Sequence, residues 1–510
     1  MPVLLPYGLE RTLTEQLNII LRSLPGLLPE LALALAFLLI ILLDLVLVGR
    51  KAEFRANVLL TFTILAWLVV GAVTLAQWQQ PPAALFEGML TGDRQTVFFQ
   101  LLFLLTAVAT LLHAYLWRTA YQHVLSGEGL ALLTGTLLGL FLLIRANHLL
   151  MTYLSVELVS LASYALASFS DERKSAEGGL KYLLFGAISS GVMLYGMSWL
   201  YGLTGSLAFT DPAFAVQLVH APSLPLWVAT ILTLSGLLFK LSAFPFHFWT
   251  PDVYEAAPTP IAAFFSVAPK AAALVILMRL LTHVPLVFTP VLAVVAIGSL
   301  AIGNLSALWQ TNGKRMLAYS SIAHAGFMLV GLVAANRFGW QCLVFYLTTH
   351  LFISMAAFYL LDLAARLSTV DPQGAWYALN RLRGLGLRHP GLGIALLAVM
   401  VALTGLPPTA GFSAKLFVFS ALWEAYHASE NPWLLGLFVF GLLNAVVALF
   451  YYLKIPFLLF FRSPTELSGR EELTGLQKLF MGYLLIPVFL FFLKPDWLMD
   501  VIAAALGGDK

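Results

Sequence analysis

Apolar stretches long enough to cross a lipid bilayer recur along this chain from Leu27 to Leu498. About 20 apolar residues in a helix span the hydrocarbon core of a bilayer. The composition agrees, because 60% of the 510 residues are hydrophobic and only 10% are charged, whereas about a quarter of a soluble domain is charged. The sequence therefore predicts an all-α polytopic membrane protein. It excludes a water-soluble enzyme, a disordered chain and a nucleic-acid-binding protein.

Polar, proline and glycine breaks separate about fourteen such segments. They run near 27–48, 56–77, 96–117, 129–145, 149–169, 181–203, 225–246, 258–281, 287–309, 315–335, 340–365, 391–425, 433–461 and 475–499. The twelfth segment contains Pro407 and Pro408, which lack N–H donors and clash with the preceding turn. A continuous helix is therefore not expected there.

Lysine and arginine residues are unequally divided between the two sets of loops. Sixteen fall in one set, and eight in the other, if the loops alternate between the two sides. The positive-inside rule places the richer set in the cytoplasm, so both termini are predicted outside. The N-terminus has acids and no basic region before a short apolar core, so no cleavable signal peptide is expected.

Redox and metal chemistry have no recognisable motif in this sequence. The single cysteine, Cys342, lies in an apolar run, so neither a disulfide nor a thiolate or iron–sulfur site is expected. A phosphate-binding glycine loop and a dinucleotide-binding motif are also missing. We therefore expect no cofactor and no metal on this chain.

Five ionisable side chains lie inside or at the edge of apolar segments: Glu157, Lys181, Lys240, Lys270 and Lys415. A charge at the bilayer centre costs at least about 2.5–3.5 kcal/mol, so such a group is a candidate functional residue. Burial in general brings the pKa values of amines and carboxyl groups toward neutrality. Groups that exchange protons near neutral pH are what a proton relay requires.

Structural roles are the alternatives for these charges. Lys181 starts its segment and can extend to the membrane interface. Glu157 can instead neutralise a lysine in a static ion pair. Asp44 and Asp362 lie near segment ends and are predicted to be interfacial, and Glu30 is predicted to be a cap or boundary residue.

Prolines interrupt two of the segments that carry these lysines. Pro245 follows Lys240 by five residues, and the Pro407–Pro408 pair precedes Lys415 by seven. Broken helices beside intramembrane charges are typical of ion sites in transporters. A simple proline kink is the alternative, but its occurrence beside a lysine in both segments favours a site.

Two histidines, His324 and His350, lie in the middle of apolar segments beside serine or threonine residues. A neutral imidazole both donates and accepts a hydrogen bond and titrates near physiological pH. Their spacing of 26 residues excludes a shared helical face and hence a two-histidine metal motif. Both are candidate relay residues, His350 the weaker, with a satisfied core histidine as the alternative.

Three long stretches resemble the antiporter-like membrane subunits of respiratory complex I. They are KLSAFPFHFWTPDVYEAAPTPIAAFFSVAPKAA (240–272), KRMLAYSSIAHAGFMLVGL (314–332) and GLPPTAGFSAKLFVF (405–419). The PFHFWTPDVYEAAPTP wording is similar to the N-type subunit (subunit 2) rather than to its larger relatives. The resemblance extends from Leu27 to about Phe461.

The resemblance implies a fold of fourteen helices with two inverted five-helix repeats, near 129–281 and 287–461, and broken helices at the seventh and twelfth segments. The corresponding division of the chain is an N-terminal three-helix segment (1–128), a first antiporter-like repeat (129–285), a second repeat (286–465) and a C-terminal helix (466–510).

The resemblance also implies a relay of protons through Glu157, Lys240, Lys270, His324 and Lys415. Glu157 is expected to hold Lys240 in its charged form by an opposite charge within about 4–6 Å. Loosening of that pair would send a proton to Lys270, and hydroxyl groups, His324 and water would carry it to Lys415. Lys181 and His350 are additional candidates for this site.

The function implied is that of a proton-translocating subunit of the NADH:quinone oxidoreductase in a bacterial plasma membrane. FMN, iron–sulfur clusters and quinone are expected in other subunits, and the M-type and K/J-type membrane subunits are expected neighbours in the lipid bilayer. Two alternatives are a subunit of a multisubunit sodium/proton antiporter and a structural spacer that retains the charges.

Overall fold

The computed structural model describes residues 7–170, 172–283, 285–368, 377–463 and 473–507. The predicted boundary at 465/466 lies outside these residues. The described part is almost entirely helical, with one short antiparallel hairpin of β1 (Ala83–Leu85) and β2 (Leu90–Gly92). The all-α membrane architecture predicted from the hydropathy is confirmed.

The first half of the chain holds the helices α1 (Tyr7–Ser23), α2 (Leu28–Val46), α3 (Ala52–Ala76), α4 (Arg94–Leu116), α5 (Gly127–Arg145), α6 (Leu149–Ala167), α7 (Arg173–Thr204), α8 (Pro212–His220), α9 (Ser223–Leu241), α10 (Trp249–Ala256), α11 (Thr259–Phe265) and α12 (Ala268–His283). A 3₁₀ turn, η1 (Leu24–Leu27), joins the first two. Capping side chains fix several starts: Asp93 accepts from the Thr96 N–H at α4, and Ser126 accepts from the Gly129 N–H at α5.

The second half holds α13 (Pro285–Leu308), α14 (Gly313–Val333), α15 (Arg337–Leu367), the 3₁₀ turn η2 (Leu379–Leu382), α16 (Leu385–Arg388), α17 (Pro390–Thr404), α18 (Ala410–Ser429), α19 (Pro432–Phe461), α20 (Gly475–Leu493) and α21 (Pro495–Ala505). Thr474 and Gln477 form a reciprocal capping box that starts α20.

Thirteen helical stretches of the described chain are long and apolar enough to cross a membrane. The twelfth predicted segment, 391–425, accounts for the difference from fourteen: it is divided at Gly405–Thr409 into α17 and α18, and α17 has only 15 residues. The break that Pro407 and Pro408 predict is therefore present, and it removes this segment from the count of continuous spans.

A second predicted break separates α9 from α10. Ser242 takes a left-handed conformation (φ 60°) directly after α9, and the turn that follows contains Pro245. A third break, which was not predicted from the sequence, lies at Ser266 and Val267 between α11 and α12. Pro269 explains it, because a proline offers no N–H to the carbonyl four residues earlier.

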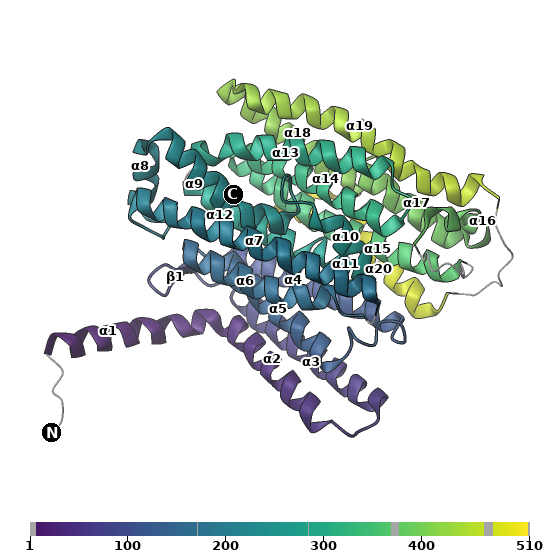
Figure 1. Cartoon of the computed structure of the whole chain (residues 1–510), viewed down its shortest axis with the longest axis horizontal. Coiled ribbons are helices and arrows are strands. Elements are labelled where there is room, and N and C mark those ends of the chain that lie inside the picture. The colour runs from purple at the N-terminus through teal and green to yellow at the C-terminus, as the bar shows by residue number, and fades with distance from the viewer. Residues whose placement is uncertain (1–6, 171, 284, 369–376, 464–472, 508–510) are drawn as a thin grey trace.

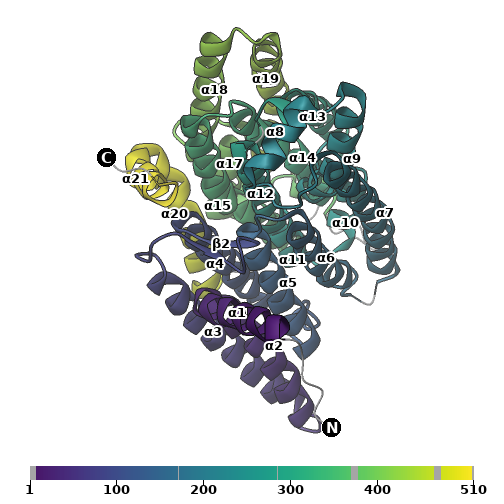
Figure 2. The same cartoon turned by 90° about the vertical axis from the view of Figure 1, so that its left-hand side faces the viewer.

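The helices form a layered bundle. In Figure 2, α2 and α3 lie at one end of the molecule and α18 and α19 at the opposite end, with α20 and α21 along one side. The stretch 259–283 and helix α15 are buried along their apolar windows, whereas α2, α3, α19 and α20 are mostly exposed. Their exposed leucine, valine and phenylalanine side chains suit a lipid environment. Helix α1 projects from this body (Figure 1).

Candidate functional site

Three lysines from different broken helices are buried in the bundle. The side chains of Lys240, Lys270 and Lys415 belong to residues only 2%, 1% and 6% exposed. None of them makes an ion pair within 4.0 Å among the residues that the structure describes. Instead, each amine contacts oxygen atoms or aromatic rings, so all three lie inside the protein rather than at lipid headgroups.

Lys240 lies in the last turn of α9 and is surrounded by aromatic rings. Its Nζ lies 3.4 Å from the Tyr182 hydroxyl, which accepts a long hydrogen bond. The same atom lies 5.4 Å from the ring centroid of Tyr164 and 5.2 Å from that of Tyr182. Cation–π attraction of this kind is worth about 2 kcal/mol when desolvated and offsets part of the cost of burial.

Glu157 of α6 does not touch Lys240. The two groups interact electrostatically, but they form no ion pair within 4.0 Å, and the buried Oε1 atom of Glu157 has no hydrogen-bond partner. Glu157 was predicted to hold Lys240 in its charged form. In this conformation it does not do so by direct contact. Tyr164, two helical turns after Glu157, supplies one of the rings around Lys240 instead.

Lys270 begins α12 directly after the third break. Its Nζ donates to the Ser321 carbonyl at 2.9 Å and to the Ser321 hydroxyl at 2.6 Å. Ser266, in the break itself, shares a hydrogen bond of 2.7 Å with Ser354 of α15. The central lysine is thus held by neutral oxygens of α14 at a point where the helix that carries it is interrupted.

His324 is the centre of a chain of hydroxyl groups. Its Nδ1 lies 2.7 Å from the Tyr346 hydroxyl and its Nε2 lies 3.0 Å from the Tyr452 hydroxyl. Tyr452 in turn lies 2.5 Å from the Ser320 hydroxyl, and Ser320 is the neighbour of the serine that binds Lys270. Because hydroxyl groups both donate and accept, this chain has the polarity that proton transfer needs.

The two predicted histidines are neighbours in space. The ring of His350 lies 4.6 Å from that of His324, and its buried Nε2 has no hydrogen-bond partner. The sequence separation of 26 residues concealed this proximity, because α14 and α15 pack against each other. The histidines therefore form one cluster rather than two isolated core residues.

Lys415 is bound by the end of the broken helix that precedes it. Its Nζ donates to the Thr404 carbonyl at 2.7 Å and to the Leu403 carbonyl at 3.3 Å. These are C-terminal carbonyls of α17, which have no partner within their own helix and favour a cation. The same Nζ lies 4.2 Å from the ring centroid of Phe327, one turn beyond His324 on α14.

Lys240, Lys270, His324 and Lys415 are called the buried row below. Lys181 lies apart from it. Its side chain is 38% exposed, and its Nζ lies 2.9 Å from both Glu177 and Asp252. Asp252 also accepts from Arg315 at 2.6 Å. Burial raises the pKa of Asp252, but the hydrogen bonds and charges of Lys181 and Arg315 outweigh it, so this pKa lies below its ordinary value.

A gap in the hydrogen bonding separates Lys240 from Lys270. The Tyr254 hydroxyl, on α10, faces the hydroxyls of Ser321 and Ser242, yet Tyr254 and Ser242 both remain without a hydrogen bond of normal geometry. Ser242 follows Lys240 by two residues, and Ser321 binds Lys270. Polar atoms placed in this way give a bridging water the two or more partners that it needs.

Several polar residues of this region were not identified from the sequence. Asp362, predicted to be interfacial, is 1% exposed and accepts from Tyr121 at 2.8 Å and lies 3.0 Å from His113 Nε2. Lys314, one of the sixteen basic residues counted in the richer set of loops, is 3% exposed. The hydroxyl chain could have been suspected from the sequence, because the pair Tyr451–Tyr452 lies inside an otherwise apolar run.

Glu30 was predicted to be a cap or boundary residue. It lies in the first turn of α2, as a cap residue would, but it is buried and forms an ion pair with the equally buried Arg145 of α5. Gln100 donates to the same carboxylate at 2.6 Å. This pair lies outside the row of lysines and joins α2, α4 and α5.

The sequence and the fold of this chain are similar to those of known proteins. A family described as "NADH:quinone oxidoreductase/Mrp antiporter, TM" matches residues 146–443. The NADH-quinone oxidoreductase subunit N of Anaeromyxobacter sp. is 39% identical over 471 residues, which cover 87% of this chain and 89% of that protein. A chain of respiratory complex I from Thermus thermophilus with bound aureothin is 33% identical, with a TM-score of 0.76 over 94% of this chain and all of that one.

A further solved structure shares only the fold. A chain of the Mrp complex from Dietzia sp. is 18% identical and superimposes with a TM-score of 0.75 over 95% of this chain and 97% of its own. The family match covers more than half of this sequence, and the subunit N relative aligns over most of both chains. The chain therefore belongs to the NADH-quinone oxidoreductase subunit N family, the antiporter-like membrane subunits of complex I.

Proposed function

We propose that this chain translocates protons through Glu157, Lys240, Lys270, His324 and Lys415, driven by quinone reduction in other subunits of the complex. The observation that carries the proposal is the burial of three lysines without an ion-pair partner. A lysine that served only structure would be paired with a carboxylate, because an isolated buried charge is costly. An amine held by neutral oxygens can instead gain and lose its proton.

The hydroxyl chain supports transfer between these lysines. Ser321 binds Lys270, and Ser320, Tyr452, His324 and Tyr346 continue the polar contacts toward His350. Phe327 separates His324 from Lys415, so the last step requires a water or a rotation of side chains. In this proposal Glu157 acts on Lys240 at a distance, and its approach or withdrawal changes how readily Lys240 holds its proton.

The coupling partners belong to the same proposal. FMN, iron–sulfur clusters and the quinone site would be in other subunits, and M-type and K/J-type subunits would flank this one in a bacterial plasma membrane. Two inverted repeats, at 129–285 and 286–465, would supply the first and second halves of the relay between the N-terminal segment 1–128 and the C-terminal helix 466–510. Both termini would face the periplasm.

The experiment is a comparison of pumping and electron transfer in the intact complex. Lys240→Met and Glu157→Gln complexes, reconstituted in proteoliposomes, are expected to assemble and oxidise NADH but to translocate fewer protons per electron. Lys478→Met, at an exposed position of α20, is the control and is expected to pump normally. A wild-type proton-to-electron ratio in both assembled variants would show that the relay assignment is wrong.

A sodium/proton antiporter subunit is the second candidate, because the matching family includes Mrp antiporters. Hard cations prefer a shell of oxygen ligands, whereas the buried row consists of amines and an imidazole, with Glu157 as the one carboxylate of the proposed relay. Protons therefore fit the row better than sodium does. Sodium-dependent proton flux through the complex without NADH and quinone would favour the antiporter instead.

A further inference from the structure

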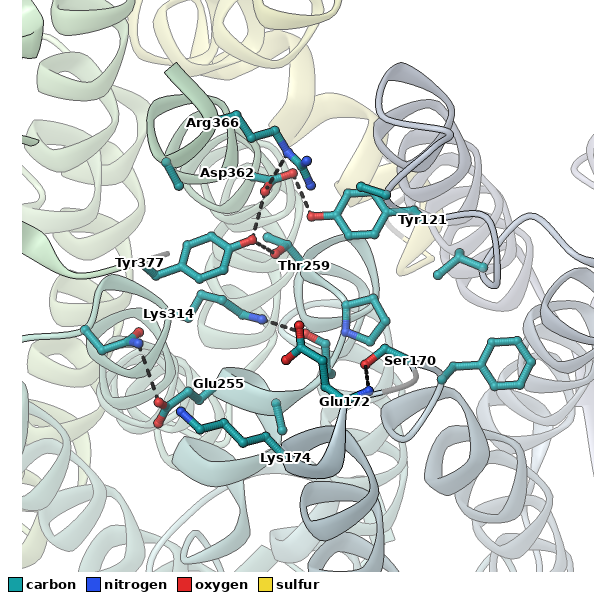
Figure 3. Close-up of a pocket in the computed structure, with 18 of the residues that line it drawn as sticks. Tyr121, Ser170, Glu172, Lys174, Glu255, Thr259, Lys314, Asp362, Arg366 and Tyr377 are labelled. Atoms are coloured by element: carbon teal, nitrogen blue, oxygen red, sulfur yellow. Dashed lines mark hydrogen bonds and ion pairs between the residues drawn. The ribbon is translucent and has the colours of Figure 1, made fainter. Parts of the chain in front are cut away.

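A polar cavity of about 570 Å³ lies at one end of the bundle, apart from the buried row (Figure 3). Its wall is built from the loops after α4, α6 and α13, from the break between α10 and α11 and from the end of α15. Charged and hydroxyl side chains line it, among them Glu172, Lys174, Glu255, Lys314, Asp362 and Tyr377.

This cavity lies on the side of the richer basic loops. Lys174 at the start of α7, Lys314 at the start of α14 and Arg366 at the end of α15 line it, and all three were counted in the set of sixteen lysine and arginine residues. The positive-inside rule assigns that set to the cytoplasm. The cavity is thus an opening toward the side from which a pump takes up protons.

Lys314 is a fourth buried lysine, and it forms the inner wall of the cavity. Its Nζ donates to the Ala257 carbonyl at 2.6 Å and lies 5.0 Å from the ring centroid of Tyr377. Three carboxylates, those of Asp362, Glu255 and Glu172, act on it electrostatically, but none forms an ion pair within 4.0 Å. Lys314 therefore has the same kind of environment as the lysines of the row.

The Asp362 carboxylate in the wall of the cavity is held in place. Asp362 accepts from Tyr121 and Tyr377, each at 2.8 Å, and from Arg366 at 3.2 Å. Tyr377 shares a further hydrogen bond of 2.7 Å with Thr259 at the start of α11. Figure 3 shows these side chains pointing toward one another on the wall opposite Glu255. Asp362 is thus held by three donors, whereas Lys314 donates to one backbone carbonyl.

Lys314 is linked to Lys270 through its own helix and through its hydrogen bond to Ala257. Lys314 is the second residue of α14, the helix whose Ser321 binds Lys270; seven residues of α-helix correspond to about 10 Å. Ala257 ends α10 and precedes α11, the short helix that leads to the break before Lys270. Tyr254 of α10, with its buried and unpartnered hydroxyl, lies between these elements and faces Ser321.

We propose that this cavity is the water-filled entry through which the row takes up protons, and that Lys314 is its proton-accepting residue. A hydronium ion in the cavity gives its proton to the neutral Lys314 amine and leaves a water molecule. The ammonium then gives the proton to a water near Tyr254 and Ser321, and returns to the neutral amine. This inference rests on the proposed function of the row and adds its entry.

The first test asks whether water reaches the cavity from the predicted side. Ala365 lines the cavity, whereas its neighbour Ala364 does not, and both are buried. The natural Cys342 is fully buried and is replaced by alanine. A membrane-impermeant methanethiosulfonate is expected to label Ala365→Cys from the side of the basic loops and to leave Ala364→Cys unlabelled. Absence of labelling at Ala365→Cys, or labelling only from the other side, would overturn the entry.

The second test separates charge from proton exchange at Lys314. Arginine keeps the positive charge but does not deprotonate in proteins, so Lys314→Arg is expected to lower the number of protons pumped per electron severalfold in the reconstituted complex. The control is Lys454→Arg, because Lys454 also donates to a backbone carbonyl, that of Gln310, at 3.0 Å but does not line the cavity. Normal pumping by Lys314→Arg would refute its role.

A failure of the proposed entry can be distinguished from a failure of the proposed function. If Lys240→Met pumps normally, the row itself is wrong, whereas the labelling of Ala365→Cys still reports on the cavity alone. If Lys314→Arg does not assemble, Lys314→Gln replaces it: reduced pumping supports the entry, and a wild-type ratio overturns it. Labelling of the cavity together with normal pumping by both Lys314 variants would leave a hydrated cavity that does not feed the row.

Discussion

Neutral oxygens and aromatic rings, rather than carboxylates, surround the buried amines of this protein. Lys270 is held by a serine and Lys415 by the carbonyl ends of a helix. Such contacts stabilise an ammonium without fixing it as strongly as a buried ion pair would. At the scale of single residues, the hydroxyl groups between these lysines are therefore the positions at which small substitutions should change proton transfer most.

Tyr452→Phe should slow proton transfer while leaving the fold intact. The substitution removes the hydroxyl that joins Ser320 to His324 and leaves their polar atoms unsatisfied, at a cost of about 1–3 kcal/mol. Tyr359→Phe is the matched control, because the buried Tyr359 hydroxyl donates to the Gln477 carbonyl at 3.1 Å instead. We expect the proton-to-electron ratio to fall only in Tyr452→Phe; equal ratios in the two variants would contradict the hydroxyl chain.

Asp252→Asn should lower stability in a manner that depends on pH. The pKa of Asp252 lies below its ordinary value of 3.8, so its ion pairs with Lys181 and Arg315 stabilise the folded state above about pH 4 and are lost as the pH falls through the folded pKa. The melting temperature of the detergent-solubilised protein should differ between wild type and variant at pH 7. The difference should shrink on acidification, and a constant difference would argue against this linkage.

Breaks in helices are the elements that bring the site together. The sequence predicted two of them from prolines next to Lys240 and Lys415, and both are present. The lysines take opposite positions, since Lys240 precedes its break and Lys415 follows its own. The third break, before Lys270, escaped prediction because Pro269 lies at the start of α12, a position where proline is compatible with a helix.

The hydropathy of the sequence located the spans and the buried lysines, because an apolar run around a charged residue is a local signal. It could not locate Lys314 or Asp362, which lie at helix ends where charged residues are ordinary; only the packing of α10, α14 and α15 shows that they are buried. It also could not determine that Glu157 and Lys240 fail to touch, since that depends on the side-chain positions of Tyr164 and Tyr182.

Gly405→Ala should disturb the second break and displace Lys415. Gly405 has a φ of +84°, and an added Cβ would lie 2.6 Å from the Lys415 Cδ atom. The left-handed conformation alone costs a non-glycine residue about 1–2 kcal/mol. We expect a lower melting temperature and reduced pumping. Gly482→Ala is the control, because nothing lies within 4 Å of its added Cβ; identical behaviour of the two variants would contradict the account.

The whole bundle depends on ion pairs that join its N-terminal helices to the rest. The Glu30–Arg145 pair connects α2 with α5, and Asp362 of α15 contacts His113 of α4. These buried contacts link segments that are more than a hundred residues apart.

Glu30→Ala should weaken this connection strongly. Loss of the carboxylate leaves Arg145 buried and unpaired, which typically costs about 3–5 kcal/mol. Glu53→Ala removes an exposed pair with Arg118 and is expected to change stability little. Thermal unfolding of the detergent-solubilised protein measures both. If the two substitutions lowered the melting temperature equally, burial of the Glu30 pair would not matter to stability.

The most direct measurement of the relay is the proton-to-electron ratio of the reconstituted complex that carries Lys270→Met. Lys270 is the central lysine and has no carboxylate partner that a methionine would leave unpaired. The account predicts NADH oxidation by quinone with a reduced number of protons translocated per electron. An assembled Lys270→Met complex that pumps at the wild-type ratio would contradict it.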